Sequence, residues 1–88
     1  MARVSEWQRY NLLRSTIESA LEEVGAEEDD FMVMAISPDL DEVEILLARD
    51  MEEGDMAEFI KEHEGWNIEA PTSMEDAIGI ADFYFDLR

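Results

Sequence analysis

The sequence predicts an α+β fold, in which a small antiparallel β-sheet of two or three strands packs against a long N-terminal helix and two shorter helices. Three observations lead to this prediction. Residues 31–36 are the longest unbroken apolar run, which is typical of a buried central strand. A second strand-like run follows at 43–49, and three other segments carry helical periodicity. The 88 residues, 47% of them hydrophobic, are enough for a single domain over 1–88.

The first helix is expected from about Ser5 to Val24. Residues 5–8, Ser-Glu-Trp-Gln, have the pattern of a capping box, in which the serine caps the helix and the glutamine reaches back to it. Gly25 follows at the position typical of a C-terminal cap. Between these ends, apolar residues recur on one helical face, namely Tyr10, Leu13, Ile17, Ala20, Leu21 and Val24.

Residues 31–36 and 43–49 are interpreted as an antiparallel hairpin. Pro38 lies between them and cannot donate into a central ladder, so the first strand should end before it. The alternative is a helix over 38–52, because Ser37, Pro38 and the acids that follow are also typical of a helix start. We prefer the hairpin, and the helix remains the open alternative.

The second half of the chain predicts two shorter helices. Residues 55–58 resemble a capping box with Asp55 as the cap, and they begin a helix over about 55–64. Residues 66–69 are expected to be extended. Residues 72–75, Thr-Ser-Met-Glu, form a further capping box that opens the last helix, although its segment 83–85 could instead end as a strand because aromatic residues favour strands.

The charge of the chain is extreme and unevenly distributed. It holds 24 acidic and 6 basic residues, for a net charge of −18. Residues 1–20 carry three arginines against two glutamates, whereas residues 21–88 carry three basic residues against 22 acids. Such a field repels nucleic acid and anionic membranes, and it attracts basic surfaces. We therefore expect a basic protein partner, no direct nucleic-acid binding and no membrane binding.

Several classes of chemistry have little support in the sequence. The absence of cysteine excludes disulfides, thiolate nucleophiles and thiolate metal ligands. His63 is the single histidine and lies at the end of a predicted helix, where a structural role is favoured. Residues 39–44 begin like a calcium loop, but Val43 takes the third ligand position and Glu44 the required glycine position. We expect a non-catalytic protein without metal or cofactor and, because no signal peptide or membrane-spanning run is visible, a cytoplasmic one.

The acids fall into clusters whose carboxylates could imitate the phosphates of a nucleic acid. One cluster precedes the central strand, a second lies in the predicted hairpin loop, and a third lies before the second helix and continues along it. A hairpin cannot bring all of these to one end, so we expect two of the three to cooperate. The candidate partner-binding carboxylates are Glu27, Glu28, Asp29 and Asp30, then Asp39, Asp41 and Glu42, then Glu52, Glu53 and Asp55.

The last third of the chain carries a family resemblance. Residues 59–60, Phe-Ile, residues 65–67, Gly-Trp-Asn, and the acid-bearing, aromatic-rich C-terminal helix resemble the small acidic anti-CRISPR proteins of phages, which block a CRISPR effector by imitating DNA. The expected order of helix, hairpin, helix and helix is also similar. The resemblance implies an inhibitor that occupies the PAM site or guide complex of such an effector, with Glu69, Glu75 and Asp76 in contact. Trp66 is a candidate aromatic anchor for the partner.

Two other functions stay open at this stage. Five arginines and one lysine beside 24 acids are typical of a halophilic structural domain, whose acidity serves solubility. Acidic immunity proteins that neutralise basic toxins, often nucleases, predict the same anionic face. The wide apolar surface of the last helix further suggests a homodimer or a partner contact.

Overall fold

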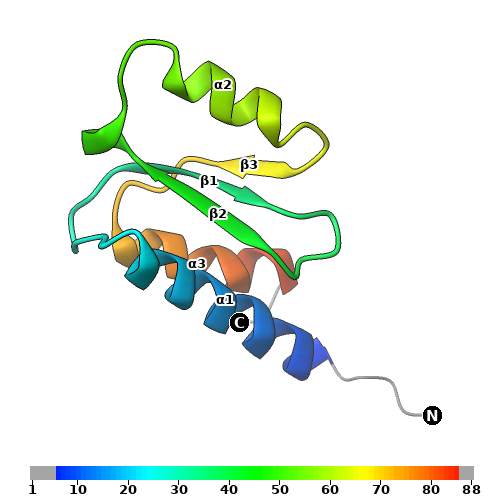
Figure 1. The fold of residues 1–88 in the computed structure, drawn as a ribbon. Coiled ribbons are helices and arrows are strands. Elements are labelled where there is room, and N and C mark those ends of the chain that lie inside the picture. Colours follow the sequence, from blue (N-terminus) through cyan, green and yellow to red (C-terminus); the bar gives the residue numbers. More distant parts are fainter. Residues whose placement is uncertain (1–5, 86–88) are drawn as a thin grey trace.

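A computed structural model describes residues 6–85 and confirms the α+β fold (Figure 1). β1 is the central strand of a sheet ordered β2-β1-β3, and it runs antiparallel to both neighbours. Within the described residues, no helix is long and apolar enough to cross a membrane. The elements are α1 (Glu6–Glu23), β1 (Met32–Ile36), β2 (Val43–Leu47), the 3-10 helix η1 (Ala48–Asp50), α2 (Asp55–Glu62), β3 (Asn67–Glu69) and α3 (Met74–Phe85).

The hairpin interpretation is confirmed, because β1 and β2 pair in register from Met32–Leu47 to Ile36–Val43. Its predicted bounds were too wide at both outer ends. Phe31 lies outside β1 and is 61% exposed, and the chain leaves β2 after Leu47 to form η1. The loop is closed by Ser37, whose hydroxyl donates to the Asp41 carboxylate (2.9 Å) and accepts the backbone N–H of Asp41 and Glu42.

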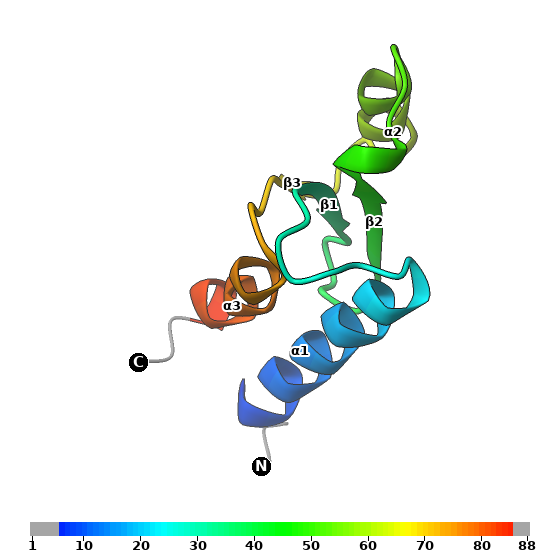
Figure 2. The same ribbon diagram turned by 90° about the vertical axis from the view of Figure 1, so that its left-hand side faces the viewer.

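The two faces of the sheet are covered differently. Helices α1 and α3 lie side by side on one face, and α2 lies alone on the other (Figures 1 and 2). The core lies between the sheet and helices α1 and α3, where each fully buried Leu, Ile or Met side chain contributes about 1.5–3 kcal/mol of transfer free energy. Alanines at two α3 positions allow that helix to pack closely. Core residues include Leu13, Ile17, Leu21, Met34, Ile36, Leu47, Ala77 and Ala81.

Helix α1 follows its prediction closely. Tyr10, Leu13, Ile17 and Leu21 are buried, with Ala20 and Val24 packed against them, and Gly25 adopts φ 71°. The proposed cap at Ser5 lies outside the described residues. The Tyr10 hydroxyl makes two hydrogen bonds. It donates to Asp82 Oδ1 of α3 (2.5 Å) and accepts from the Arg14 guanidinium, one turn further along α1 (3.3 Å).

Helix α2 begins differently from its prediction. Gly54, with φ 91°, takes the cap position and makes no side-chain capping bond. Asp55 is the first helical residue, and its carboxylate instead accepts the backbone N–H of Glu52 (2.8 Å), which closes the preceding loop. None of the α2 residues is buried, and the apolar side chains of Met56 and Ile60 remain 46% and 41% exposed. This helix is therefore lightly packed on the sheet.

Helix α3 is capped one residue later than predicted. Ser73, rather than Thr72, accepts the N–H of the residue three positions on (3.0 Å), and that residue is Asp76 rather than Glu75. The Asp76 carboxylate in turn accepts the N–H of Thr72 (3.1 Å). The helix continues to Phe85, so the alternative of a terminal strand over 83–85 is wrong.

Candidate functional site

The acidic side chains of the described residues all lie at the surface. None is buried, and only Asp30, Asp55 and Glu69 are as much as half-buried. The predicted carboxylates are thus available as a group, and their arrangement around the fold decides which of them can meet one partner.

The fold gathers three acidic segments at one end of the molecule, on the left in Figure 1 and facing the viewer in Figure 2. Residues 27–30 are fixed to the start of α3 by a bond from the Met74 N–H to the Glu28 carbonyl (3.0 Å). They are joined to η1 by the Ala48 N–H, which donates to Phe31 (2.8 Å), and by Arg49. We call this surface the acidic end. Its carboxylates are Glu27, Glu28, Asp29, Asp30, Asp50, Glu52, Glu53, Glu75 and Asp76.

Arg49 stands among these acids as the single basic residue in segments 27–30, 48–53 and 71–76. Its guanidinium donates to the Gly25 carbonyl (2.6 Å) and pairs with Asp30 (3.4 Å). Asp30 also accepts the Glu27 N–H (2.7 Å), so this carboxylate is committed to holding the loop. Glu27, Glu28 and Asp29 remain exposed and line one open pocket of about 340 Å³ with Asp30.

The hairpin cluster lies at the opposite end of the sheet (Figure 1). Asp39, Asp41 and Glu42 belong to the loop between β1 and β2, on the far side of the strands from residues 27–30. All three are exposed, and Asp41 also accepts a hydrogen bond from the Ser37 hydroxyl. The hairpin loop therefore lies apart from the other two predicted clusters. Residues 27–30 and the Glu52–Glu53 stretch lie together at the acidic end.

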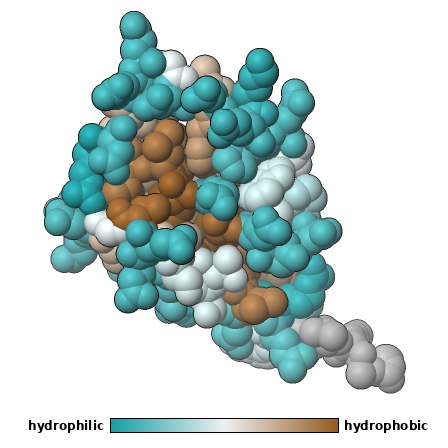
Figure 3. Space-filling model, viewed as in Figure 1, coloured by the Kyte–Doolittle hydropathy of each residue, from teal (hydrophilic) through white to brown (hydrophobic). Residues whose placement is uncertain are grey.

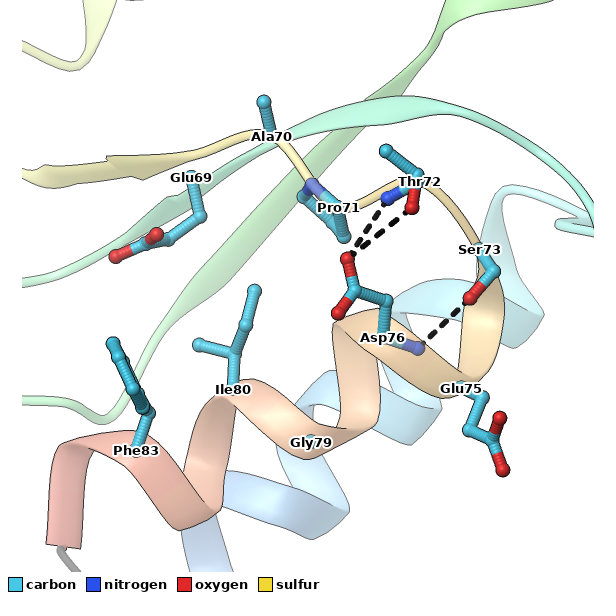
Figure 4. Close-up of a pocket in the computed structure, with 10 residues that line it drawn as sticks. All are labelled: Glu69, Ala70, Pro71, Thr72, Ser73, Glu75, Asp76, Gly79, Ile80 and Phe83. Carbon is cyan, nitrogen blue, oxygen red and sulfur yellow. Dashed lines mark hydrogen bonds between the residues drawn. The ribbon is translucent and has the colours of Figure 1, made fainter.

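The three carboxylates implied by the family resemblance line one pocket of about 570 Å³ between β3 and α3 (Figure 4). Glu69 comes from β3, while Glu75 and Asp76 come from the first turn of α3. Ile80 and Phe83 form the apolar part of the pocket, and Phe83 is 83% exposed.

Two of these carboxylates already have partners within the chain. Asp76 belongs to the α3 cap, and Glu69 accepts the hydroxyl of Tyr84 (2.8 Å). The pKa of the Tyr84 hydroxyl lies well above the ordinary range, mainly because the side chain is partly buried and secondly because of this hydrogen bond. Glu75 has no such intramolecular role in the pocket, and it also lines a second pocket, of about 390 Å³, with Arg14, Glu28 and Asp82.

The aromatic candidates divide between core and surface. Trp66 is half-buried and meets His63 edge-on, with ring centroids 5.0 Å apart. It therefore belongs to an aromatic group with His63 and Phe59 at the C-terminal end of α2, which is not part of the acidic end. Phe83 is the far more exposed aromatic and lies in the Glu69 pocket. The sequence offered one signal for this, since Phe83 falls outside the apolar face of its helix.

The single histidine, His63, is held in place by its neighbours. His63 ends α2, its Nδ1 lies 2.7 Å from the Phe59 carbonyl, and its ring contacts those of Phe59 and Trp66. This is the structural position at a helix C-terminus that the sequence predicted. Within residues 6–85, no group of three or more His, Cys, Asp or Glu side chains is arranged to hold a metal ion.

Sequence reasoning missed Arg49 as an organiser of the acidic end. The available signal was its position as a lone arginine in an acidic stretch, directly after a predicted strand. Comparisons of the chain with family models, with curated proteins and with solved structures give no match.

Proposed function

We propose that this protein is a non-catalytic inhibitor that binds a basic, nucleic-acid-handling protein and occupies its nucleic-acid groove. The observation that carries the proposal is the acidic end, where segments distant in sequence present exposed carboxylates around a single basic residue that is itself committed to the loop. A CRISPR effector or another nuclease, acting in the cytoplasm, is the partner class to test.

The physical basis is electrostatic imitation of a polyanion. A groove that binds DNA or RNA carries Lys and Arg side chains, and its affinity depends on releasing the counterions that those charges and the phosphates hold. A rigid surface of carboxylates satisfies the same cations. A net charge of −18 also accelerates encounter with such a groove over a distance of about one Debye length.

The local structure gives this surface a fixed shape. Backbone bonds from Met74 and Ala48 and the Arg49 contacts hold residues 27–30 against the neighbouring segments. A loop whose backbone is held in place loses less conformational entropy on binding than an unrestrained acidic tail would. Glu75 and the Glu69 pocket continue the surface along α3, which supports assigning the residues implied by the resemblance to the same interface.

The test compares two variants with the same loss of charge. The first is Glu27→Gln, Glu28→Gln and Asp29→Asn at the acidic end, and the second is Glu58→Gln, Glu62→Gln and Glu64→Gln on and just after α2. Each is immobilised and exposed to host lysate, and retained proteins are identified by mass spectrometry with and without competing double-stranded DNA.

We expect the native chain and the α2 variant to retain one nucleic-acid enzyme that DNA displaces, and the acidic-end variant to lose it. Equal loss in both variants would show that total charge alone attracts the partner. Retention of proteins that do not handle nucleic acid would contradict the proposal.

A further inference from the structure

Strand β2 is an open edge of the sheet. Among residues 6–85 its only neighbour is β1, and the bonds to β1 come from its even-numbered residues, as the bonds joining Ser37 to Glu42 and Ala48 to Phe31 show. In an antiparallel ladder, successive residues point their N–H and C=O groups to opposite sides. The N–H and C=O groups of Val43, Ile45 and Leu47 therefore point away from the sheet, toward the open edge.

This edge lies in an apolar setting. Figure 3 shows a hollowed hydrophobic patch on the face that presents β2, between α2 and α1, with a hydrophilic rim. Ile45 and Leu46 are half-buried, and the flanking helix α2 leaves Met56 and Ile60 exposed. Soluble proteins usually protect an edge strand with charged side chains, proline or a bulge. In β2, which reads VEILL, Glu44 is the single charge, and the strand has neither proline nor a bulge.

Acidic residues flank the open edge at both ends. Residues 39–42 contribute Asp39, Asp41 and Glu42 directly before the strand, and residues 50–53 contribute Asp50, Glu52 and Glu53 shortly after it. The β2 edge thus connects two acidic clusters that lie at opposite ends of the sheet. A ligand matched to it needs an apolar centre and a positive charge at each end.

We propose that the open edge of β2 binds an extended segment of a basic partner by strand addition. The segment has about five apolar or β-branched residues, enough to follow β2 over roughly 17 Å, with Lys or Arg on both flanks. A second copy of the chain is disfavoured, because antiparallel pairing about Ile45 would bring residues 39–42 of one copy beside residues 48–53 of the other, where the single base, Arg49, is already committed to Gly25 and Asp30. The inference rests on the proposed function only for the sign of the partner's charge.

The first experiment follows amide exchange by NMR in the full chain. The probe is a synthetic peptide with two Lys or Arg residues at each end and five Val or Thr residues between them. In the free chain, the amides of Val43, Ile45 and Leu47 should exchange fast while those of Glu44 and Leu46 are protected. The peptide should slow exchange of the first three by about tenfold or more, leaving the other two unchanged.

The control is the same peptide carrying N-methyl groups on alternate central residues, which removes the donors of one edge and keeps the charge. We expect its affinity to fall about tenfold or more. Equal binding by both peptides, or binding that leaves the three amides fast, would overturn strand addition in favour of electrostatic contact alone. If these amides are protected without peptide, and the protection increases with the concentration of the chain, the edge pairs with a second copy and the proposal is overturned.

A variant provides an independent arm. Ile45→Pro removes an N–H that faces the open edge, a position where an edge strand tolerates proline, and Ile45→Val retains it. Peptide binding should be lost in the proline variant and kept in the valine variant, and binding by both would overturn the inference. If the proline variant does not fold, the N-methyl peptide still decides.

The two proposals fail separately. One outcome is that the peptide leaves the amides of Val43, Ile45 and Leu47 fast while the chain still retains from lysate a partner that DNA displaces. This result would reject strand addition and keep the inhibitor function. Amide protection by the peptide, combined with a retained partner that does not handle nucleic acid, would keep the β2 edge as a binding site and reject the inhibitor function.

Discussion

Arg49 stabilises the acidic end through contacts that no other residue there can replace. Its guanidinium bonds the Gly25 carbonyl at 2.6 Å and pairs with Asp30 at 3.4 Å. Arg49→Met keeps most of the stem and removes the donors, and we expect a loss of about 1 kcal/mol in the free energy of unfolding. A bond from a charged donor contributes roughly 1.5–3 kcal/mol, which the half-exposed position of Arg49 reduces.

Urea unfolding measures this loss, with Lys61→Met as the matched control. Lys61 is exposed on α2, and its removal makes the chain more negative by the same single charge. Equal destabilisation of the two variants would mean that net charge, rather than the Arg49 contacts, sets the effect.

Tyr84 couples stability to alkaline pH. Its hydroxyl is half-buried and donates to Glu69 at 2.8 Å, and these two effects raise its pKa above the ordinary value of about 10. The folded state therefore retains this proton more tightly than the unfolded state does. The resulting stability is fully present below about pH 10 and is lost as the pH rises toward the folded pKa.

The measurement is the free energy of unfolding between about pH 8 and 11 in the native chain and in Tyr84→Phe. We expect a steeper decline in the native chain, since the variant lacks the hydroxyl whose pKa is raised by folding. Parallel profiles would show that Tyr84 is no better protected than a tyrosine in the unfolded chain.

At the scale of elements, the sequence predicted best where one helical or strand period is buried along its whole length. Tyr10, Leu13, Ile17 and Leu21 repeat at helical spacing and are all buried in α1, and the apolar run of β1 is buried on both faces. Burial of one face requires apolar residues at the period of the helix or strand, so the sequence itself shows the element. Element ends were less predictable because neighbouring residues offer equivalent chemistry.

The start of α3 illustrates the difficulty with ends. Thr72 and Ser73 can each cap a helix, and Glu75 and Asp76 can each complete a capping box. The choice of Ser73 with Asp76 accompanies a tertiary bond from Met74 to the Glu28 carbonyl, which no local pattern contains. The packing of α2 was no easier to predict, since Met56 and Ile60 lie at helical spacing like core residues and yet are 46% and 41% exposed.

The sequence was enough to predict which acidic residues belong to the candidate site, but not which of them lie together on the surface. Exposure of the carboxylates follows from their chemistry, and the hairpin alone showed that the clusters could not all meet. Which segments do meet depends on β3, whose antiparallel pairing with β1 returns residues 71–76 to the end that holds residues 27–30. Long-range strand pairing of this kind leaves no local trace in sequence.

At the scale of the whole molecule, a net charge of −18 opposes folding through self-repulsion, and the core must overcome it. Two explanations of the acidity make different demands. A halophilic domain depends on salt to be stable, whereas an inhibitor that imitates nucleic acid must be folded at the salt concentration at which its partner binds DNA. The core between the sheet, α1 and α3 contains large side chains with no exposed surface, such as Leu13, Ile17 and Met34. Such a core favours stability without added salt.

Thermal unfolding from about 0.05 to 1 M NaCl separates these explanations, since the Debye length falls from above 10 Å to about 3 Å over this range. We expect a chain that is already folded at the lowest concentration, with a Tm that rises by only a few degrees as repulsion is screened. The acidic-end variant, with three fewer charges, should start higher and rise less. Partner binding should weaken over the same range, because counterion release loses its advantage in high salt. A chain that is unfolded at low salt and folds only near molar salt would identify the acidity as an adaptation to salt and would reject imitation of nucleic acid.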